Sequence, residues 1–118
     1  QRLARKNCKD CRVQDDDVNP KVLKDLGFSE EDASKVKAIK GKGCSKCSDT
    51  GYKGRQGIYE ILVVSKPIKE AILKQATTPE LREIAIKEGF RTMQDMGRRM
   101  IASGELNFRE YERVLSSE

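Results

Sequence analysis

Histidine and tryptophan are absent from this chain of 118 residues, and phenylalanine occurs only three times. The chain also lacks the phosphate-binding loop G-x-x-x-x-G-K-[ST] and the nucleophile motif G-x-S-x-G. All four cysteines fall in C-x-x-C pairs, so none is left over for nucleophilic chemistry. We therefore do not expect this chain to form an active site by itself.

Long apolar runs are also missing. No stretch approaches the roughly 18 consecutive apolar residues that a membrane-spanning helix needs, and no secretory signal opens the chain. These absences predict a soluble, cytoplasmic protein. Because the chain begins with QRLARKNC rather than methionine, we expect it to be part of something longer.

Apolar residues are scarce. The hydrophobic set makes up 36% of the chain and charged residues another 36%, so apolar burial alone is expected to stabilise the fold only weakly. A further constraint is therefore predicted. The formal net charge of +5 is a mild excess of interspersed charges, which favours a solvated surface over a nucleic-acid interface.

The cysteines supply a candidate for that constraint. They form two C-x-x-C pairs, Cys8 with Cys11 and Cys44 with Cys47. Each pair can occupy two corners of a tetrahedron from one tight turn, so together they predict a four-thiolate zinc site. With every position filled by protein, such a zinc is structural rather than catalytic.

Other uses of the cysteines stay open at this point. Two disulfides, redox chemistry or an iron cluster would each use the same residues. Disulfides suit secreted chains, which this one does not resemble. The run Asp15 to Asp17 is interpreted as a solvated loop, because consecutive side chains point in different directions and nothing nearby completes a coordination shell.

Secondary structure is indicated by the spacing of apolar residues and by turn residues. One short helix is predicted to end at Gly27, and Ser29 is expected to cap another. After Cys47 the sequence predicts a β-hairpin in which Tyr52 starts one strand, Gly54 to Gly57 turn the chain, and Ile58 to Val64 form the return strand.

From Ser65 onward the apolar period becomes helical. Four helices are expected within 65–76, 78–89, 92–104 and 107–115, and they should pack as a small bundle. Ser65, Thr78 and Asn107 are expected to cap the first, second and fourth of them. The predicted fold is α+β and mostly helical. A zinc-stapled subdomain with a hairpin occupies 1–64, and a C-terminal helical subdomain occupies 65–118.

Two motifs resemble a known family. QRLARKNCKDC matches a Q-R-L-x-R-x-x-C-x-x-C segment, and Gly43 to Glu60 matches G-C-x-x-C-x-x-T-G-Y-x-G-R-x-G-I-Y-E. Both are typical of the C-terminal region of the ATPases that power type IV pilus assembly and type II secretion. EGFRTMQDMG and SGELNFREYERVL also resemble that region. Phe90, Met96 and the run Leu106 to Phe108 depart from the family pattern and leave the subfamily open.

The resemblance implies a role inside a larger machine. The family is a hexameric RecA-like motor whose ATP- and magnesium-binding segments precede this region, so the chain would be a non-catalytic fragment that needs its parent for ATPase activity. Its zinc subdomain would stiffen the motor for force transmission and docking. The implied partners are the rest of the ATPase, neighbouring subunits and an inner-membrane platform protein, on the cytoplasmic side of that membrane.

Two arginines in these motifs, Arg2 and Arg55, are candidates for an intersubunit or nucleotide-sensing role. The alternative is that both are structural. A function of a different class is a free-standing zinc ribbon that binds nucleic acid. It would need aromatic and basic side chains interleaved along the hairpin, and the chain offers only a sparse version of this pattern in Tyr52, Lys53, Arg55 and Tyr59. The sequence does not decide between pilus assembly and secretion.

Overall fold

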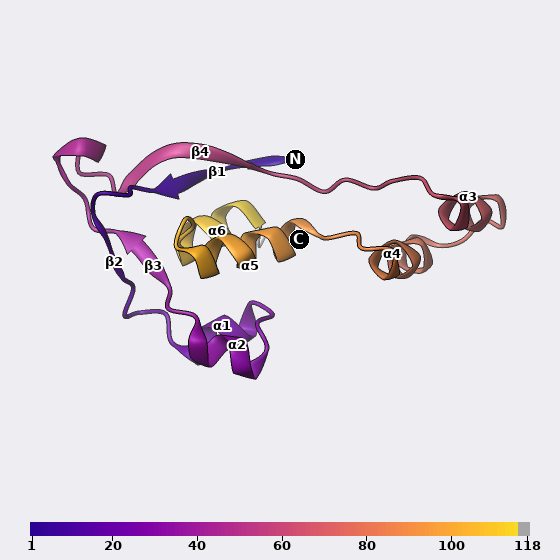
Figure 1. The fold of residues 1–118 in the computed structure, drawn as a ribbon, viewed down its shortest axis with the longest axis horizontal. Coiled ribbons are helices and arrows are strands. Elements are labelled where there is room, and N and C mark those ends of the chain that lie inside the picture. The colour runs from indigo at the N-terminus through magenta and orange to yellow at the C-terminus, as the bar shows by residue number, and fades with distance from the viewer. Residues whose placement is uncertain (116–118) are drawn as a thin grey trace.

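The computed structural model describes residues 1–115 as an elongated molecule that measures 56 × 29 × 21 Å (Figure 1). Strands and helices are mixed, as the predicted α+β class requires. The elements are β1 (Arg2–Asn7), β2 (Arg12–Gln14), α1 (Pro20–Asp25), α2 (Glu30–Lys35), β3 (Ile39–Gly41), a 3-10 turn η1 (Ser45–Cys47), β4 (Tyr52–Ile58), α3 (Lys66–Leu73), α4 (Thr78–Lys87), α5 (Met93–Ser103) and α6 (Phe108–Leu115).

The longest strands, β1 and β4, pair with each other in antiparallel fashion, with Arg2 opposite Ile58 and Arg5 opposite Arg55. The predicted hairpin is therefore wrong. Residues 54–57 lie inside β4 rather than in a turn, and residues 59–64 form no strand. The partner of β4 comes from the start of the chain, and the spacing of apolar residues within one segment carries no information about so distant a partner.

Gly54 explains why a turn was expected at this place. Its φ is +84°, a left-handed conformation that glycine adopts without strain. In the structure Gly54 lies where the register of the strand pair shifts: Arg5 pairs with Arg55, but Asn7 pairs with Tyr52. The glycine therefore marks a β-bulge, the other common use of an isolated glycine in a strand.

A second antiparallel pair joins β2 to β3, with Val13 opposite Lys40. The chain between these strands folds into α1 and α2, which pack together. Asn19 caps α1 by accepting a hydrogen bond from the Val22 N–H at 3.0 Å. Ser29 caps α2 as predicted, accepting from the Asp32 N–H at 3.1 Å.

The main buried cluster brings both ends of the chain together. It includes Ala4 and Ile58 from the β1–β4 ribbon, Leu23 from α1, Ile101 from α5 and Leu115 from α6. It draws residues from both sides of the predicted boundary between 64 and 65. The predicted division into two subdomains, 1–64 and 65–118, stays a prediction.

The four C-terminal helices do not form one bundle, contrary to the prediction. In Figure 1, α3 and α4 lie side by side at one end of the molecule, whereas α5 and α6 lie beneath the β1–β4 ribbon. The two pairs are separated by the extended connections on either side of α3–α4. Helix formation was predicted correctly, but capping and amphipathic spacing do not specify which helices pack together.

Most of the predicted helix ends are found. Ser65 caps α3 as predicted, and Asn107, also as predicted, accepts from the Glu110 N–H at 2.7 Å at the start of α6. Thr92, for which no cap was predicted, caps α5. The expected cap of α4 is off by one residue: Thr77, not Thr78, accepts from the Glu80 N–H at 3.3 Å. No helix within residues 1–115 is long and apolar enough to cross a bilayer.

Candidate metal centre

The first cysteine pair lies where β1 ends and β2 begins. Cys8 directly follows β1, and its N–H donates to the Gly51 carbonyl at 2.9 Å. Cys11 directly precedes β2, and its carbonyl accepts from the Lys42 N–H at 2.9 Å. Both backbone bonds join the first pair to the loop that carries the second. The two C-x-x-C turns are therefore held together before any metal is considered.

The second pair is carried by the 3-10 turn η1. Thr50 closes this turn, its hydroxyl donating to the Cys47 carbonyl at 2.7 Å. The loop then returns so close to β3 that a Cβ placed on Gly41 would lie 1.9 Å from the Gly51 carbonyl oxygen. Only glycine permits this approach of two backbones, which explains why the glycines at these positions accompany the cysteines.

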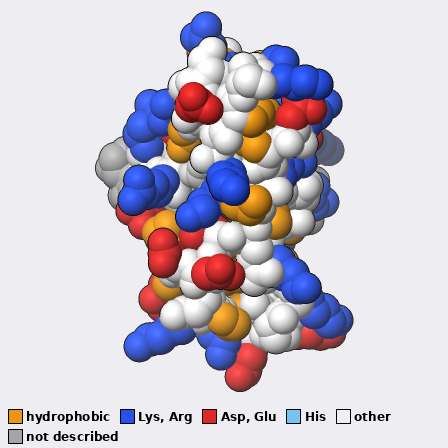
Figure 2. Space-filling view, turned by 90° about the vertical axis from the view of Figure 1, so that its left-hand side faces the viewer, with side chains coloured by type: hydrophobic (Ala, Val, Ile, Leu, Met, Phe, Trp, Pro, Cys, Tyr) orange, Lys and Arg blue, Asp and Glu red, His pale blue; other side chains and the backbone are white. Residues whose placement is uncertain are grey.

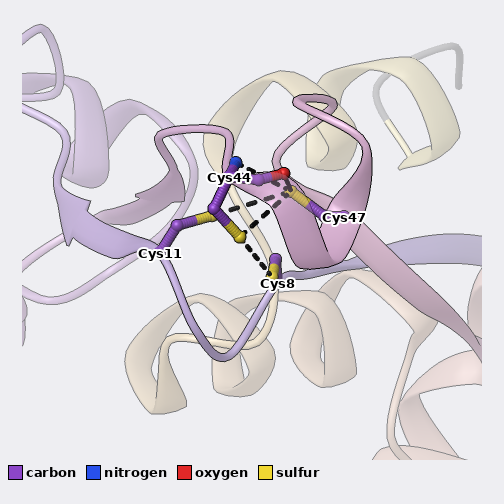
Figure 3. A group of neighbouring side chains, drawn as sticks. All are labelled: Cys8, Cys11, Cys44 and Cys47. Carbon is purple, nitrogen blue, oxygen red and sulfur yellow. Dashed lines mark hydrogen bonds between the residues drawn. The ribbon is translucent and has the colours of Figure 1, made fainter.

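The four sulfurs converge on one point (Figure 3). The Sγ–Sγ distance is 3.8 Å for Cys8 with Cys44, 3.8 Å for Cys11 with Cys47, and 3.7 Å for Cys44 with Cys47. All four ligand atoms lie within 4.8 Å of one another. The spacings are far longer than the roughly 2.05 Å of a disulfide, so the cysteines are free thiols that could bind one metal ion.

Backbone N–H groups point at these sulfurs. Cys47 Sγ accepts from the N–H groups of Cys44 and Gly51, each at 3.2 Å. Burial raises the pKa of the Cys47 thiol, but these donors lower it and the net pKa is about 6. Such bonds favour a thiolate, the form that ligates metals.

Burial raises the pKa of the Cys11 thiol, and although the Gly43 N–H donates to its sulfur at 3.3 Å and opposes this effect, the resulting pKa is about 12. Without a metal, the cluster therefore keeps protons that metal binding would displace.

The centre is enclosed on its inner side. Cys8 and Cys47 are buried, and Cys11 and Cys44 are half-buried. Among residues 1–115 this is the one group of three or more Cys, Asp or Glu whose ligand atoms could share a metal. Asp15 to Asp17 are not part of it. The Asp15 side chain instead accepts from the Asp17 N–H at 3.2 Å, a local turn in keeping with the solvated loop that was predicted.

The two candidate arginines are not brought together. Arg2 lies opposite Ile58 and Arg55 lies opposite Arg5, so their positions differ by three residues and they face opposite sides of the ribbon. Arg2 donates from Nη1 to the Val114 carbonyl on α6. Arg55 is exposed on the outer side.

Sequence reasoning missed a buried polar group beside the cysteines. Asn7 is 1% exposed, and its Nδ2 donates to the Ile39 carbonyl at 3.1 Å and to the Gly104 carbonyl at 2.9 Å. Its Oδ1 accepts from Asn107, which also donates to the Tyr52 hydroxyl at 3.0 Å. Asn7 thus ties the residue before Cys8 to the C-terminal helices. No local sequence signal identifies such a role.

An ion-pair network on α6 was also missed. Glu110 is fully buried and accepts from Arg5 Nη2 at 3.0 Å and from Arg113 Nη2 at 2.6 Å. Burial raises the pKa of Glu110, but the bonds from Arg113 and Arg5 outweigh it and lower the pKa to about 2. The spacing of Glu110 and Arg113 by three residues could have indicated their pairing, but nothing local indicates Arg5.

Comparison with known proteins gives consistent results. A family profile described as type II/IV secretion system protein matches residues 1–113. The type IV pilus assembly ATPase PilB of Thermus thermophilus is 40% identical over 97 residues, which are 82% of this chain and 11% of that protein.

More distant relatives include members from both kinds of machine. The type II secretion system protein HxcR of Pseudomonas aeruginosa is 33% identical over 97% of this chain and 20% of its own length. The PilB ATPase of Myxococcus xanthus is 31% identical over 93% of this chain and 19% of its own length. The chain therefore spans only about a tenth to a fifth of the curated relatives it matches.

Proposed function

The chain belongs to the family of type II/IV secretion system proteins, and from this premise we propose that it is a metal-stabilised, non-catalytic part of a hexameric ATPase that drives type IV pilus assembly or type II secretion. The names of the relatives support both kinds of machine. The ATP that is hydrolysed, with its Mg²⁺, would bind elsewhere in the parent protein, because this chain has no phosphate-binding loop.

The metal proposed is one structural Zn²⁺ held by Cys8, Cys11, Cys44 and Cys47. The observation that carries this proposal is the sulfur spacing of 3.7–3.8 Å. Zinc–thiolate bonds of about 2.3 Å in a tetrahedron place the sulfurs about 3.8 Å apart. When bound, the ion would supply no chemistry beyond cross-linking the two turns, since all four positions are filled by protein.

A cross-link at this place has a mechanical consequence. The first cysteine pair stands between β1 and β2, and the second stands between β3 and β4. The ion would therefore lock the junction of the two small sheets, which otherwise depend on few backbone bonds. Asn7 continues this junction into the C-terminal helices. A block tied in this way can transmit motion between neighbouring parts of a motor without deforming.

The remaining assignments follow from the family. We propose that the block contacts the rest of its ATPase, neighbouring subunits and an inner-membrane platform protein, on the cytoplasmic side of the inner membrane. Arg55, which is exposed, is the better candidate for an intersubunit or nucleotide-sensing role. Arg2 already donates to the Val114 carbonyl, so its role within the chain is at least partly structural.

The nucleic-acid alternative has less support. Arg5 covers one face of the Tyr52 ring at 4.1 Å, and the Tyr52 hydroxyl accepts from Asn107. One face of this ring is therefore not free to stack on a base. Figure 2 shows Lys and Arg side chains interspersed with acidic ones on the face at the cysteine end, without one continuous basic patch.

Metal analysis of the freshly purified 118-residue chain tests the proposal. We expect one equivalent of zinc, and less than half an equivalent after replacement of Cys44 by Ser. A variant with Ser45→Ala, next to the ligand, is the matched control and should keep the full equivalent. Metal-free protein with an unchanged fold would contradict the structural role, and iron in place of zinc would contradict the identity of the metal.

A further inference from the structure

An open cleft lies on the β1–β4 ribbon, and none of the four cysteines lines it. Its volume is about 700 Å³, and Arg5, Tyr52, Arg55 and Arg113 line it together with Leu3 and Thr50. Three of these side chains are guanidinium groups. They come from β1, from β4 and from α6, so the fold itself gathers positive charge that is spread over the sequence.

The strand register places two of these charges face to face. Arg5 and Arg55 are directly opposite each other in the antiparallel pair. Like charges at such a position destabilise a sheet, whereas an aromatic or oppositely charged partner would stabilise it. The arrangement is unfavourable unless something negatively charged lies between or beside the two guanidinium groups.

Glu110 neutralises only part of this charge. Its Oε1 accepts from Arg5 Nη2 at 3.0 Å and from Arg113 Nε at 2.8 Å. Its Oε2 accepts from the Arg5 N–H and from Arg113 Nη2, both at 2.6 Å. The two oxygens thus have their main acceptor positions occupied, and Glu110 is fully buried.

Arg55 is left without a counter-ion. Within residues 1–115 its side chain has no hydrogen bond or ion pair, although it lines the cleft. The Nη1 groups of Arg5 and Arg113 take no part in the bonds to Glu110. Counting three arginines against one glutamate, the cleft carries a net charge of about +2, with at least one complete guanidinium fork free to bind.

We propose that this cleft binds a ligand through a phosphate group. A phosphate monoester carries a charge of about −1.5 to −2 at neutral pH, which matches the net charge of about +2 in the cleft. A single carboxylate would neutralise only about half of that positive charge. Guanidinium forks bind phosphate oxygens in bidentate fashion. Arg5 is held in place for this purpose by Glu110 and by the Tyr52 ring. The inference does not depend on the ATPase function proposed above.

Calorimetric titration of the zinc-loaded 118-residue chain with inorganic pyrophosphate, without magnesium and at low ionic strength, tests this inference. We expect saturable binding that weakens as salt is added. Arg55→Gln should weaken binding at least about tenfold, the loss expected for one charge-assisted bidentate contact. Because Arg55 has no partner in the described chain, this change should leave the fold and the zinc content unaltered.

Matched variants and ligands separate the possible outcomes. Arg82→Gln on α4 removes the same charge at an exposed site far from the cleft and should leave pyrophosphate affinity unchanged. Arg55→Lys keeps the positive charge but loses the bidentate guanidinium geometry. Its affinity for pyrophosphate should therefore lie between that of the parent chain and that of Arg55→Gln. ATP should bind like pyrophosphate, and adenosine should not bind.

Three results would overturn the proposal. One is the absence of pyrophosphate binding at millimolar concentrations, and another is equal affinity in the parent chain and in Arg55→Gln. The third is tighter binding of a tetraglutamate peptide than of pyrophosphate, which would assign the cleft to an acidic protein partner. Zinc content is measured in each sample, so failure of this inference is distinguishable from failure of the metal proposal.

Discussion

The cysteine-bearing end of the molecule and the α3–α4 pair at the opposite end are organised differently (Figure 1). At the cysteine end, elements from both ends of the described chain pack together, and the buried cluster includes both Ala4 and Leu115. Among the described residues, no side chain of α3 or α4 belongs to that cluster. Long-range contacts hold the first region, whereas caps and local pairing hold the second.

The exposed side chains show the same difference. Ile72, Leu73 and Ile86 of the helix pair are 52%, 83% and 51% exposed. The preceding connection, 61–64, also consists of exposed apolar residues. At the cysteine end, by contrast, polar Asn7 is buried with its bonds satisfied. A region with few apolar residues can be rigid when its polar groups and thiols are paired, and a more apolar region can remain weakly packed.

Metal removal should separate the two regions most strongly. Structural zinc contributes on the order of 10 kcal/mol in small sites, and the cysteine end has little apolar burial to compensate. After treatment with a strong chelator, we expect the native amide resonances of β1, β2, β3 and β4 to disappear from NMR spectra. The signals of α3 and α4 should move much less. Equal losses in both regions would contradict the comparison.

A glycine in each region offers the next test. A Cβ on Gly97 of α5 would lie 2.4 Å from Leu115 Cδ1 and 2.8 Å from the Tyr111 ring. Gly97→Leu should therefore destabilise the chain by about 3 kcal/mol through overpacking. Urea denaturation measures the change.

Gly89, which follows α4, is the matched control. Its φ is +97° and a Cβ there would meet nothing within 4 Å, so Gly89→Ala should cost only the strain of the left-handed conformation, about 1 kcal/mol. If the two variants lose the same stability, then α5 and α6 are not packed as described.

Glu110 should make the cysteine end sensitive to acid. Its pKa is lowered to about 2 in the folded chain, below its ordinary value of about 4.3. A depressed pKa contributes stability above the unfolded value, and this contribution is lost as the pH falls from about 5 towards 2. Allowing for half-exposed arginine partners, we expect about 2 kcal/mol.

The variant Glu110→Gln isolates this contribution from acid release of the metal. It should be less stable than the parent at pH 7, and the difference between the two proteins should shrink at low pH. Urea denaturation at several pH values, with zinc content monitored, gives the comparison. A difference that stays constant with pH would show that Glu110 acts by packing alone.

Sequence reasoning succeeded where the signal is local. The convergence of four cysteines and the caps Ser29, Ser65 and Asn107 each depend on residues within a few positions or on a recognisable spacing. The β1–β4 pairing joins residues about fifty positions apart, and its only local trace, Gly54, equally indicates a turn. Arg5 and Glu110 were missed for the same reason, because ion pairs between distant elements leave no periodic pattern.

The smallest expected change in the free energy of unfolding comes from an exposed leucine in the α3–α4 pair, compared with a buried leucine at the cysteine end. Leu23 of α1 is 1% exposed and belongs to the main cluster, whereas Leu73 of α3 is 83% exposed. Leu73→Ala should change the free energy of unfolding by about 0.5 kcal/mol or less. Leu23→Ala, measured by the same urea denaturation, should cost about 3 kcal/mol, because it removes apolar contacts and leaves a cavity. A large loss for Leu73→Ala would mean that this face is covered in solution, and a loss that grows with protein concentration would identify a second copy of the chain as the cover.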